Sequence, residues 1–259
     1  MGIKDDAKKI VDAFALRTTA GVWPHVQRTP LVADLKNRID NPDLISSYYV
    51  NLCGPAAFLR NLANDNPQVY AQAVVDLFES GEASIGKRKI KPGKDLKAAA
   101  FVNTSPADWI PLASLRDDDN WFLDYQSEAD AVSGITMPHT LADWFSKAGY
   151  KEVLNETNVF FTKDAEHAKR ASMLYGRGYK VCLFINAQML KASTQNDSST
   201  TPDHWVVMAS ALSQNSVGGE LQVNLKVHSW GQILSVPSTG TFSMKTFVKN
   251  YYGFVACKT

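Results

Sequence analysis

Cys53 is the residue of this sequence whose type and neighbours are best suited to covalent chemistry. It is followed by Gly54, Pro55 and an apolar run, a pattern that predicts a buried helix starting beside the cysteine. The N-terminus of a helix carries partial positive charge, which favours a thiolate over a thiol. Cys53 is therefore a candidate nucleophile. The rest of the chain has to supply a base, a group that orients the base and an oxyanion donor.

Two histidines in the second half of the chain are candidates for the base. His204 opens a predicted strand directly after the Ser/Thr/Asn-rich segment 193–202, and His228 ends a later predicted strand. A histidine at the end of a strand can point its ring away from the sheet, towards a helix N-terminus. The remaining histidines are interpreted as structural or exposed side chains: His25, His139 and His167.

The elements that must position these residues are predicted from hydrophobic periodicity, caps and turn residues. Helices are expected at 5–16, 31–39, 53 to the stop signal at 64–67, 67–79, 107–115, 140–148, 164–176 and 243–250. Strands are expected at 83–92 (a strand or a hairpin), 153–161, 180–186, 204–212, 221–229, 232–236 and 253–258. Helices come first and a run of antiparallel strands follows, which is typical of the α+β class.

The length of the chain favours one large domain. With 259 residues and 45% hydrophobic content, it can bury a sizeable core. We expect a single domain over 1–259 with three parts. Residues 1–45 form an N-terminal helical extension, residues 46–150 a helical subdomain with the nucleophile, and residues 151–259 an antiparallel-sheet subdomain with the histidines.

Composition limits the partners and the compartment. The net charge of +1, from 27 basic and 26 acidic residues, gives no electrostatic reason to expect nucleic acid or an anionic membrane. Three cysteines indicate free thiols in a reducing compartment. The N-terminus has acidic residues and no apolar run, so no Sec signal is predicted. We expect a cytoplasmic protein as synthesised, with export open to a secretion system that ignores Sec signals.

Three short motifs carry a resemblance to a known family. Cys-Gly-Pro-Ala-Ala-Phe at 53–58, His-Trp-Val-Val at 204–207 and His-Ser-Trp-Gly at 228–231 resemble the landmarks of the papain-like cysteine peptidase superfamily. The first two are similar to those of bacterial leader-processing peptidases, and the third is similar to the Asn-Ser-Trp-Gly of papain. Their order agrees, and about 150 residues separate the cysteine from the first histidine, as is typical of papain-type enzymes.

The resemblance assigns roles to individual residues. It implies that Cys53 is the nucleophile and that His204 is the general base that shares its proton. His228 occupies the position of the asparagine that orients the base in papain, so the sequence departs from the family pattern there. An imidazole can hydrogen-bond the ring of His204, but it titrates near neutrality. Ser229 and Gln232 are alternatives for the same role.

The resemblance also predicts the surroundings of the catalytic pair. It implies that Trp230 shields the orienting hydrogen bond from water. The oxyanion glutamine of papain lies six residues before the cysteine, where this sequence has Ser47. Asn51 is the nearest amide donor and is the candidate for the oxyanion site, together with the backbone N–H of Cys53.

The implied activity is acyl transfer through a thiolate. Such a pair can act as a protease, an amidase that cleaves cell-wall amides, a glutamine deamidase or a transpeptidase. The expected partner is a protein or peptide substrate, peptidoglycan included, and no cofactor or metal is required. The chain also resembles toxin-type bacterial effectors that are injected into neighbouring cells, which implies a cognate inhibitor or immunity protein.

Two alternatives stay open at this point. One is a catalytically inactive papain-like fold used as a binding module, supported by His228 and by the missing glutamine. The other is a metal enzyme that uses Cys53, His204 and His228. The metal hypothesis is the weaker of the two, because the sequence has no short-spaced pair of ligands.

Overall fold

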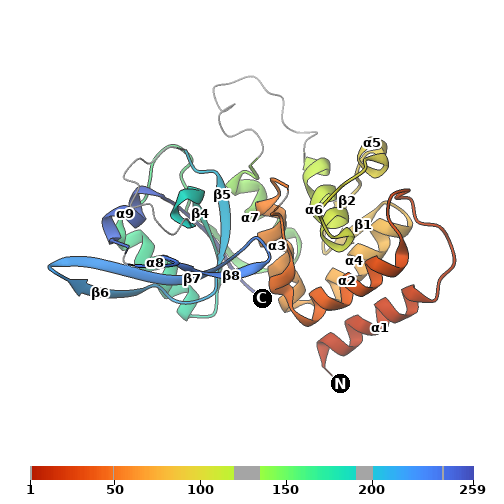
Figure 1. Cartoon of the computed structure of the whole chain (residues 1–259), viewed down its shortest axis with the longest axis horizontal. Helices are drawn as coiled ribbons and strands as arrows, with labels where there is room; N and C mark the ends of the chain where they lie inside the picture. The colour runs from red at the N-terminus through yellow and green to blue at the C-terminus, as the bar shows by residue number, and fades with distance from the viewer. Residues whose placement is uncertain (1, 49, 120–134, 191–200, 241) are drawn as a thin grey trace. The chain divides into compact units, whose positions relative to one another are not determined.

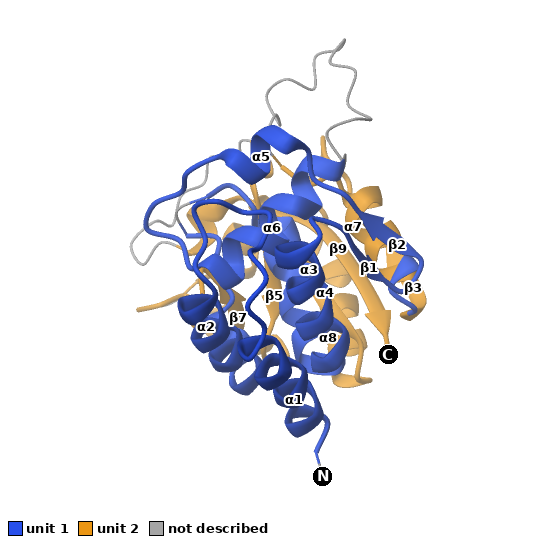
Figure 2. Cartoon of the chain, turned by 90° about the vertical axis from the view of Figure 1, so that its right-hand side faces the viewer, with its two compact units in different colours: residues 1–126, 147–149 blue, residues 127–146, 150–259 orange. Residues whose placement is uncertain are grey.

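The computed structural model describes residues 2–48, 50–119, 135–190, 201–240 and 242–259 (Figure 1). Its helices and antiparallel strands confirm the predicted α+β class. The chain divides into two compact units (Figure 2). The first contains Met1–Gln126 and Lys147–Gly149, and the second contains Ser127–Ser146 and Tyr150–Thr259. Most of the helix at Pro138–Lys147 therefore groups with the sheet that follows it.

The first unit is mainly helical. Its elements are α1 (Ile3–Ala15), α2 (Arg28–Asp40), the 3-10 turn η1 (Pro42–Leu44), α3 (Cys53–Asp65), α4 (Pro67–Glu79), the hairpin strands β1 (Ala83–Ile85) and β2 (Arg88–Ile90), α5 (Lys94–Ala98) and α6 (Pro106–Asp119). The helix predicted at 67–79 and the hairpin predicted within 83–92 are confirmed. Asn66 caps α4 by accepting a hydrogen bond from the backbone N–H of Val69, as expected for an Asn-Pro helix start.

Helix α3 is the buried centre of the first unit. Ten of its thirteen residues are buried, including those on every side of its first two turns. A helix that is apolar all round has to be surrounded by other elements, and α3 packs against α2, α4, α6 and η1. The apolar residues that follow Cys53 are therefore needed for packing. The surrounding elements also hold the first turns of α3 in place.

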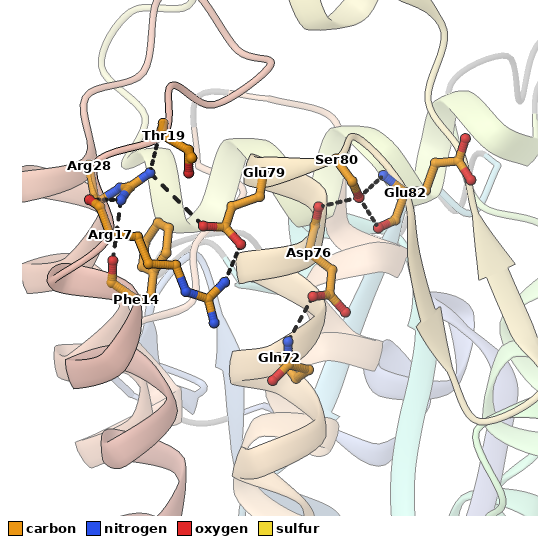
Figure 3. A network of polar contacts seen from close by, with 9 residues as sticks. All are labelled: Phe14, Arg17, Thr19, Arg28, Gln72, Asp76, Glu79, Ser80 and Glu82. Atoms are coloured by element: carbon orange, nitrogen blue, oxygen red, sulfur yellow. Dashed lines mark hydrogen bonds and ion pairs between the residues drawn. The ribbon is translucent and has the colours of Figure 1, made fainter.

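A guanidinium group fixes the long connection between α1 and α2 (Figure 3). Arg28 donates to the backbone carbonyls of Phe14, Arg17 and Thr19. Its charged carbon lies 4.7 Å above the ring of Phe14, within the range of a cation–π contact. Arg17 pairs with Glu79 at the end of α4. Because unpaired carbonyls at a helix C-terminus attract cations, Arg28 closes the end of α1.

The second unit is an antiparallel sheet with helices. Its elements are α7 (Pro138–Lys147), β3 (Lys151–Asn155), α8 (Ala165–Gly176), β4 (Lys180–Ile185), the 3-10 turn η4 (Ala187–Leu190), β5 (His204–Met208), β6 (Ser213–Val217), β7 (Glu220–Ser229), β8 (Gln232–Val236), α9 (Met244–Lys249) and β9 (Tyr251–Lys258). The strand order is β3-β9-β4-β5-β7-β6, and β8 pairs with β7. Every pairing is antiparallel.

The two faces of this sheet are built differently. One face packs on α8 and α9 through apolar side chains that include Val206 and Val227 of the sheet and Phe247 of α9. The other face carries an aromatic group, in which Trp205 stacks on Phe184 with ring centroids 4.5 Å apart. The indole N–H of Trp205 donates to the carbonyl of Thr136, just before α7. Alternation along β5 therefore sends His204 and Trp205 to opposite faces.

The strand predictions differ from the structure at several ends. The strand predicted at 204–212 stops at Met208, and the one predicted at 153–161 lies at 151–155. Strand β6 was not predicted, because its sequence Ser-Gln-Asn-Ser-Val lacks the apolar alternation that marks a half-buried strand. The predicted loop 193–202 lies largely outside the described residues. Within the described part of the chain, no helix has the length and apolarity needed to cross a bilayer.

Candidate functional site

Cys53 is the first residue of α3, as predicted. Its side chain is buried, with 8% of the residue surface exposed. The preceding residue, Leu52, has φ −119° and ψ 37° and offers no side-chain cap. The start of the helix is therefore left without the Ser, Thr, Asp or Asn that would occupy its N–H groups. An uncapped helix start of this kind is suited to stabilising a negatively charged group, such as a thiolate or an oxyanion.

The first backbone donors of α3 are few and well defined. The N–H of Leu52 donates to the carbonyl of Val50, and the N–H of Ala56 makes the first helical bond, to the carbonyl of Leu52. Pro55 has no N–H at all. The first N–H groups of a helix have no carbonyl within it to bond, and the backbone N–H of Cys53 stays the predicted oxyanion donor.

The two side chains considered for the oxyanion site differ in exposure. Asn51 is exposed, two residues before the cysteine, and Ser47 is buried. The backbone N–H of Val50 donates to the carbonyl of Ser47, which makes a turn between them. The role predicted for Asn51 stays a prediction. The backbone N–H of Cys53 is the donor whose position the helix itself fixes.

His204 is the first residue of β5 and is buried, with 6% of its surface exposed. Burial lowers the pKa of His204 to about 4, because the imidazolium loses its hydration in the interior. The ring is therefore neutral at pH 7. A neutral imidazole has one nitrogen that carries a proton and one that can accept one.

Ser229 is the hydrogen-bond partner of His204. Its Oγ lies 2.7 Å from Nε2 of the ring, and both residues are buried. The donor in this contact depends on the tautomer of the imidazole. When Nε2 carries the proton and donates it to Ser229, Nδ1 keeps its lone pair and can accept a proton from a thiol. The contact thus fixes the ring and can select the tautomer that a base requires.

Trp230 lies beside the ring of His204 and belongs to a constrained turn. Ser229 pairs with Gln232 across β7 and β8, and the two residues between them, Trp230 and Gly231, have φ of 52° and 78°. Two positive φ values are the mark of a type I′ hairpin turn. A bulky residue is costly in this conformation. In this turn, the indole ring of Trp230 lies 5.0 Å from the imidazole ring of His204, measured between ring centroids.

His228 does not make the orienting contact that the papain pattern assigns to its position. It pairs with Val207 of β5 and with Ile233 of β8 and is buried. Adjacent residues of a strand point to opposite faces, so the face on which Ser229 meets His204 is not the face of His228. The contact predicted for His228 is thus made by Ser229, one of the alternatives. A catalytic role for His228 stays a prediction.

The other histidines were interpreted as structural or exposed. His25 and His139 are exposed. The expectation of an exposed His167 is wrong, because its ring is half-buried and its Nδ1 lies 2.9 Å from the hydroxyl of Tyr251. Burial lowers the pKa of His167. The contact joins α8 to β9 and was not visible in the sequence, since 84 residues separate the two partners.

The positions of the other two cysteines and of the histidines bear on the alternative of a metal enzyme. Cys182 and Cys257 form no disulfide and are fully buried in β4 and β9. Among the described residues, no group of three His, Cys, Asp or Glu side chains could hold a metal ion. A metal shared by His204 and His228 is disfavoured further, because neighbouring strands present these side chains on opposite faces.

Comparison with models of known protein families finds no match, and no curated protein is significantly similar to the chain. What the structure itself defines is an α+β protein in two compact units. The first unit places a cysteine at the start of a buried helix. The second holds a buried histidine between a serine and a tryptophan.

Proposed function

We propose that the chain is a cysteine hydrolase that acts on amide bonds, with Cys53 as nucleophile and His204 as general base. The observation that carries this proposal is the contact of His204 Nε2 with Ser229 beneath Trp230. Fixing one ring nitrogen inside the protein leaves the other to exchange a proton, which is the arrangement a base needs. The position of Cys53 at an uncapped helix start supports its role as the nucleophile.

The reaction follows from these two groups. Nδ1 of His204 takes the proton of the Cys53 thiol, and the thiolate sulfur attacks the carbonyl carbon of the amide. The backbone N–H groups at the start of α3 stabilise the oxyanion. The tetrahedral adduct collapses as the imidazolium protonates the leaving amine, which departs. Water then loses a proton to His204 and attacks the thioester, and the acid is released as Cys53 recovers its proton.

The proposed substrate is an amide in a protein or peptide, with glutamine side chains and peptidoglycan stems as further members of the class. All of them place a carbonyl next to a nitrogen leaving group, so the same steps apply. A toxin-type role with a cognate inhibitor, and export without a Sec signal, stay predictions. The catalytically inactive binding module is the alternative that the next experiment addresses.

The test is the alkylation of the three cysteines by iodoacetamide across pH, followed by mass spectrometry. Cys53 in the wild type is expected to react at pH 7 at least about tenfold faster than Cys182 and Cys257, because the neutral imidazole of His204 accepts its proton as the sulfur attacks. His204→Ala is expected to lower the rate constant of Cys53 alkylation at pH 7 by about tenfold or more, because the thiol loses the neutral base that accepts its proton. The two buried cysteines are internal controls for loss of structure.

Two outcomes would contradict the proposal. An unchanged rate constant of Cys53 alkylation at pH 7 in His204→Ala would mean that the two groups do not exchange a proton. A wild-type Cys53 that reacts no faster than the same cysteine in the unfolded chain would favour the inactive binding module.

Ser229→Ala tests the orienting contact. Loss of one hydrogen bond worth about 1 kcal/mol is expected to lower the rate constant of Cys53 alkylation at pH 7 roughly five- to tenfold. His228→Asn, the matched variant at the neighbouring position, is expected to change it less than about twofold. If His228→Asn had the larger effect, the orienting role would belong to His228.

A further inference from the structure

A buried amide lies where the chain leaves β4, next to the start of β5. Asn186 follows Ile185, the last residue of β4, and only 3% of its surface is exposed. Its Nδ2 donates to the carbonyl of Thr201 at 2.8 Å, and its Oδ1 accepts the backbone N–H of Gln188 at 3.0 Å. Burial of an amide is costly unless it is hydrogen-bonded. The two bonds reach different stretches of backbone, so this side chain joins those stretches.

The carboxylate of Asp203 makes a second link between the same stretches. Its Oδ1 accepts the backbone N–H of Ala187, the first residue of η4, at 2.6 Å. Its backbone N–H donates to the carbonyl of Ile185 at 3.0 Å. A carboxylate that accepts a backbone N–H makes a charge-assisted bond, which is stronger than a bond between neutral groups. Asp203, the residue before His204, is therefore tied to the end of β4 and to the start of η4.

Asn186 is itself held by its own backbone. Its N–H donates to the carbonyl of Asn250, the residue before β9, at 2.9 Å. Asn250 is 2% exposed, and its Nδ2 donates to the carbonyl of Thr246 in α9 at 3.0 Å. The amide of Asn186 thus projects from a backbone that is fixed against β9 and α9, which makes it a stiff anchor.

Both links act at the start of β5. We define the strand-entry segment as residues 201–204, which ends at His204, the first residue of the strand. Asn186 holds this segment at Thr201, and Asp203 holds it one residue before the histidine. The ends of secondary-structure elements are the parts that fray most easily. Two side-chain links immediately before His204 oppose such fraying.

We propose that Asn186 and Asp203 are positioning residues for His204, holding the strand-entry segment so that the imidazole keeps its contact with Ser229. Neither side chain touches the reacting atoms in this proposal. Its catalytic meaning rests on the proposed function, in which His204 is the base. Its structural content, the order of the start of β5, is independent of that function.

The first readout is amide hydrogen exchange, measured by NMR in Asn186→Ala and in Asp203→Ala. The backbone N–H at position 203 is expected to exchange about tenfold faster than in the wild type, because the strand-entry segment loses a link. Exchange at 206–208, in the interior of β5, is expected to change less than about twofold. A rise confined to the strand-entry segment is the signature of a positioning role.

The second readout is the pKa of His204, from an NMR titration of its ring signals, assigned by comparison with His204→Gln. Burial holds this pKa at about 4 in the wild type. In both alanine variants it is expected to rise by about one unit, because a frayed strand start lets water reach the imidazole. The rate constant of Cys53 alkylation at pH 7 is expected to fall about threefold, since the ring keeps its productive orientation for less of the time.

Two side chains of the same unit supply matched controls. Asp164 caps α8 by accepting the backbone N–H of His167 at 2.9 Å. The Oδ1 of Asn158 accepts the backbone N–H groups of Phe160 and Phe161 at 2.8 and 3.0 Å. The bonds are of the same kind, but the anchored backbone is not the strand-entry segment. Asp164→Ala and Asn158→Ala are therefore expected to change neither the exchange at position 203 nor the pKa of His204.

Asp203→Asn separates the bond from the charge, because the amide oxygen can still accept the N–H of Ala187. Exchange at position 203 is expected to stay within about twofold of the wild type. Asp203 is exposed, so Asp203→Ala opens no cavity and decides the test alone if Asn186→Ala does not fold.

The positioning role is overturned if Asp203→Ala leaves both the exchange at position 203 and the pKa of His204 unchanged. It is also overturned if exchange rises equally throughout the second unit. Failure of the proposed function is read separately, on the wild type, from a Cys53 without enhanced alkylation.

Discussion

Replacement of Cys53 by alanine is expected to abolish amide hydrolysis, by roughly five orders of magnitude, since loss of a catalytic nucleophile removes covalent catalysis entirely. The fold is expected to survive. Cys53 is the first residue of α3, and alanine at this position keeps a small apolar side chain. The free energy of unfolding should change by about 1 kcal/mol or less. The measurements are hydrolysis of the amide substrate on which the wild type acts, and urea unfolding.

Cys182→Ala is the matched control for this prediction. It removes the same sulfur from the interior of β4, where the thiol is fully buried. Activity should therefore persist, with at most a loss of stability from the small cavity. Full activity of Cys53→Ala would refute the assignment of the nucleophile. Loss of cooperative unfolding in Cys53→Ala would make this cysteine a packing residue.

Acidification is expected to destabilise the protein through His204. The pKa of this residue is about 4 in the fold, below the ordinary value of 6.5. The unfolded chain thus binds more protons than the native chain between these two pH values, and stability rises with pH there. The contribution is complete above pH 6.5 and is lost as the pH falls towards 4. Between pH 7 and pH 4.5 the loss from this one group is about 2 to 3 kcal/mol.

The control is His204→Gln, whose amide is of similar length and does not titrate. Urea unfolding at pH 7 and pH 4.5 gives the difference for each protein, and the wild type should lose about 2 to 3 kcal/mol more than the variant. Other groups that titrate in this range, such as the half-buried His167, are common to both and cancel. Equal losses in the two proteins would mean that His204 is charged in the native state.

Much of the fold could be predicted because its signals are local. Helix α4 begins at Pro67, directly after its N-cap Asn66, as the Asn-Pro pair predicts. The helix that begins at Cys53 follows from Gly54, Pro55 and the apolar run. Strand β6 could not be predicted, because both its faces are exposed and a strand without a buried face has no alternation to read.

The candidate site was predictable in its parts but not in its contacts. Types and spacing selected Cys53 and His204, and the turn between β7 and β8 could have been predicted from the two residues that separate the strands. The choice of Ser229 over His228 depends on which face of β7 meets His204. That face is set by the pairing register of distant strands, which one sequence does not specify. The contact of His167 with Tyr251 could not be predicted for the same reason, since 84 residues separate its partners.

The turn at Trp230 places two demands on one position that no single amino acid meets fully. Its backbone, at φ 52°, suits glycine or asparagine, whereas its contact with His204 needs a large aromatic ring. A change to glycine would relax the hairpin and, in the same step, uncover the imidazole. Selection for thermal stability alone would therefore drive this position away from tryptophan. Consensus or stability-guided engineering of this protein should hold residue 230 fixed.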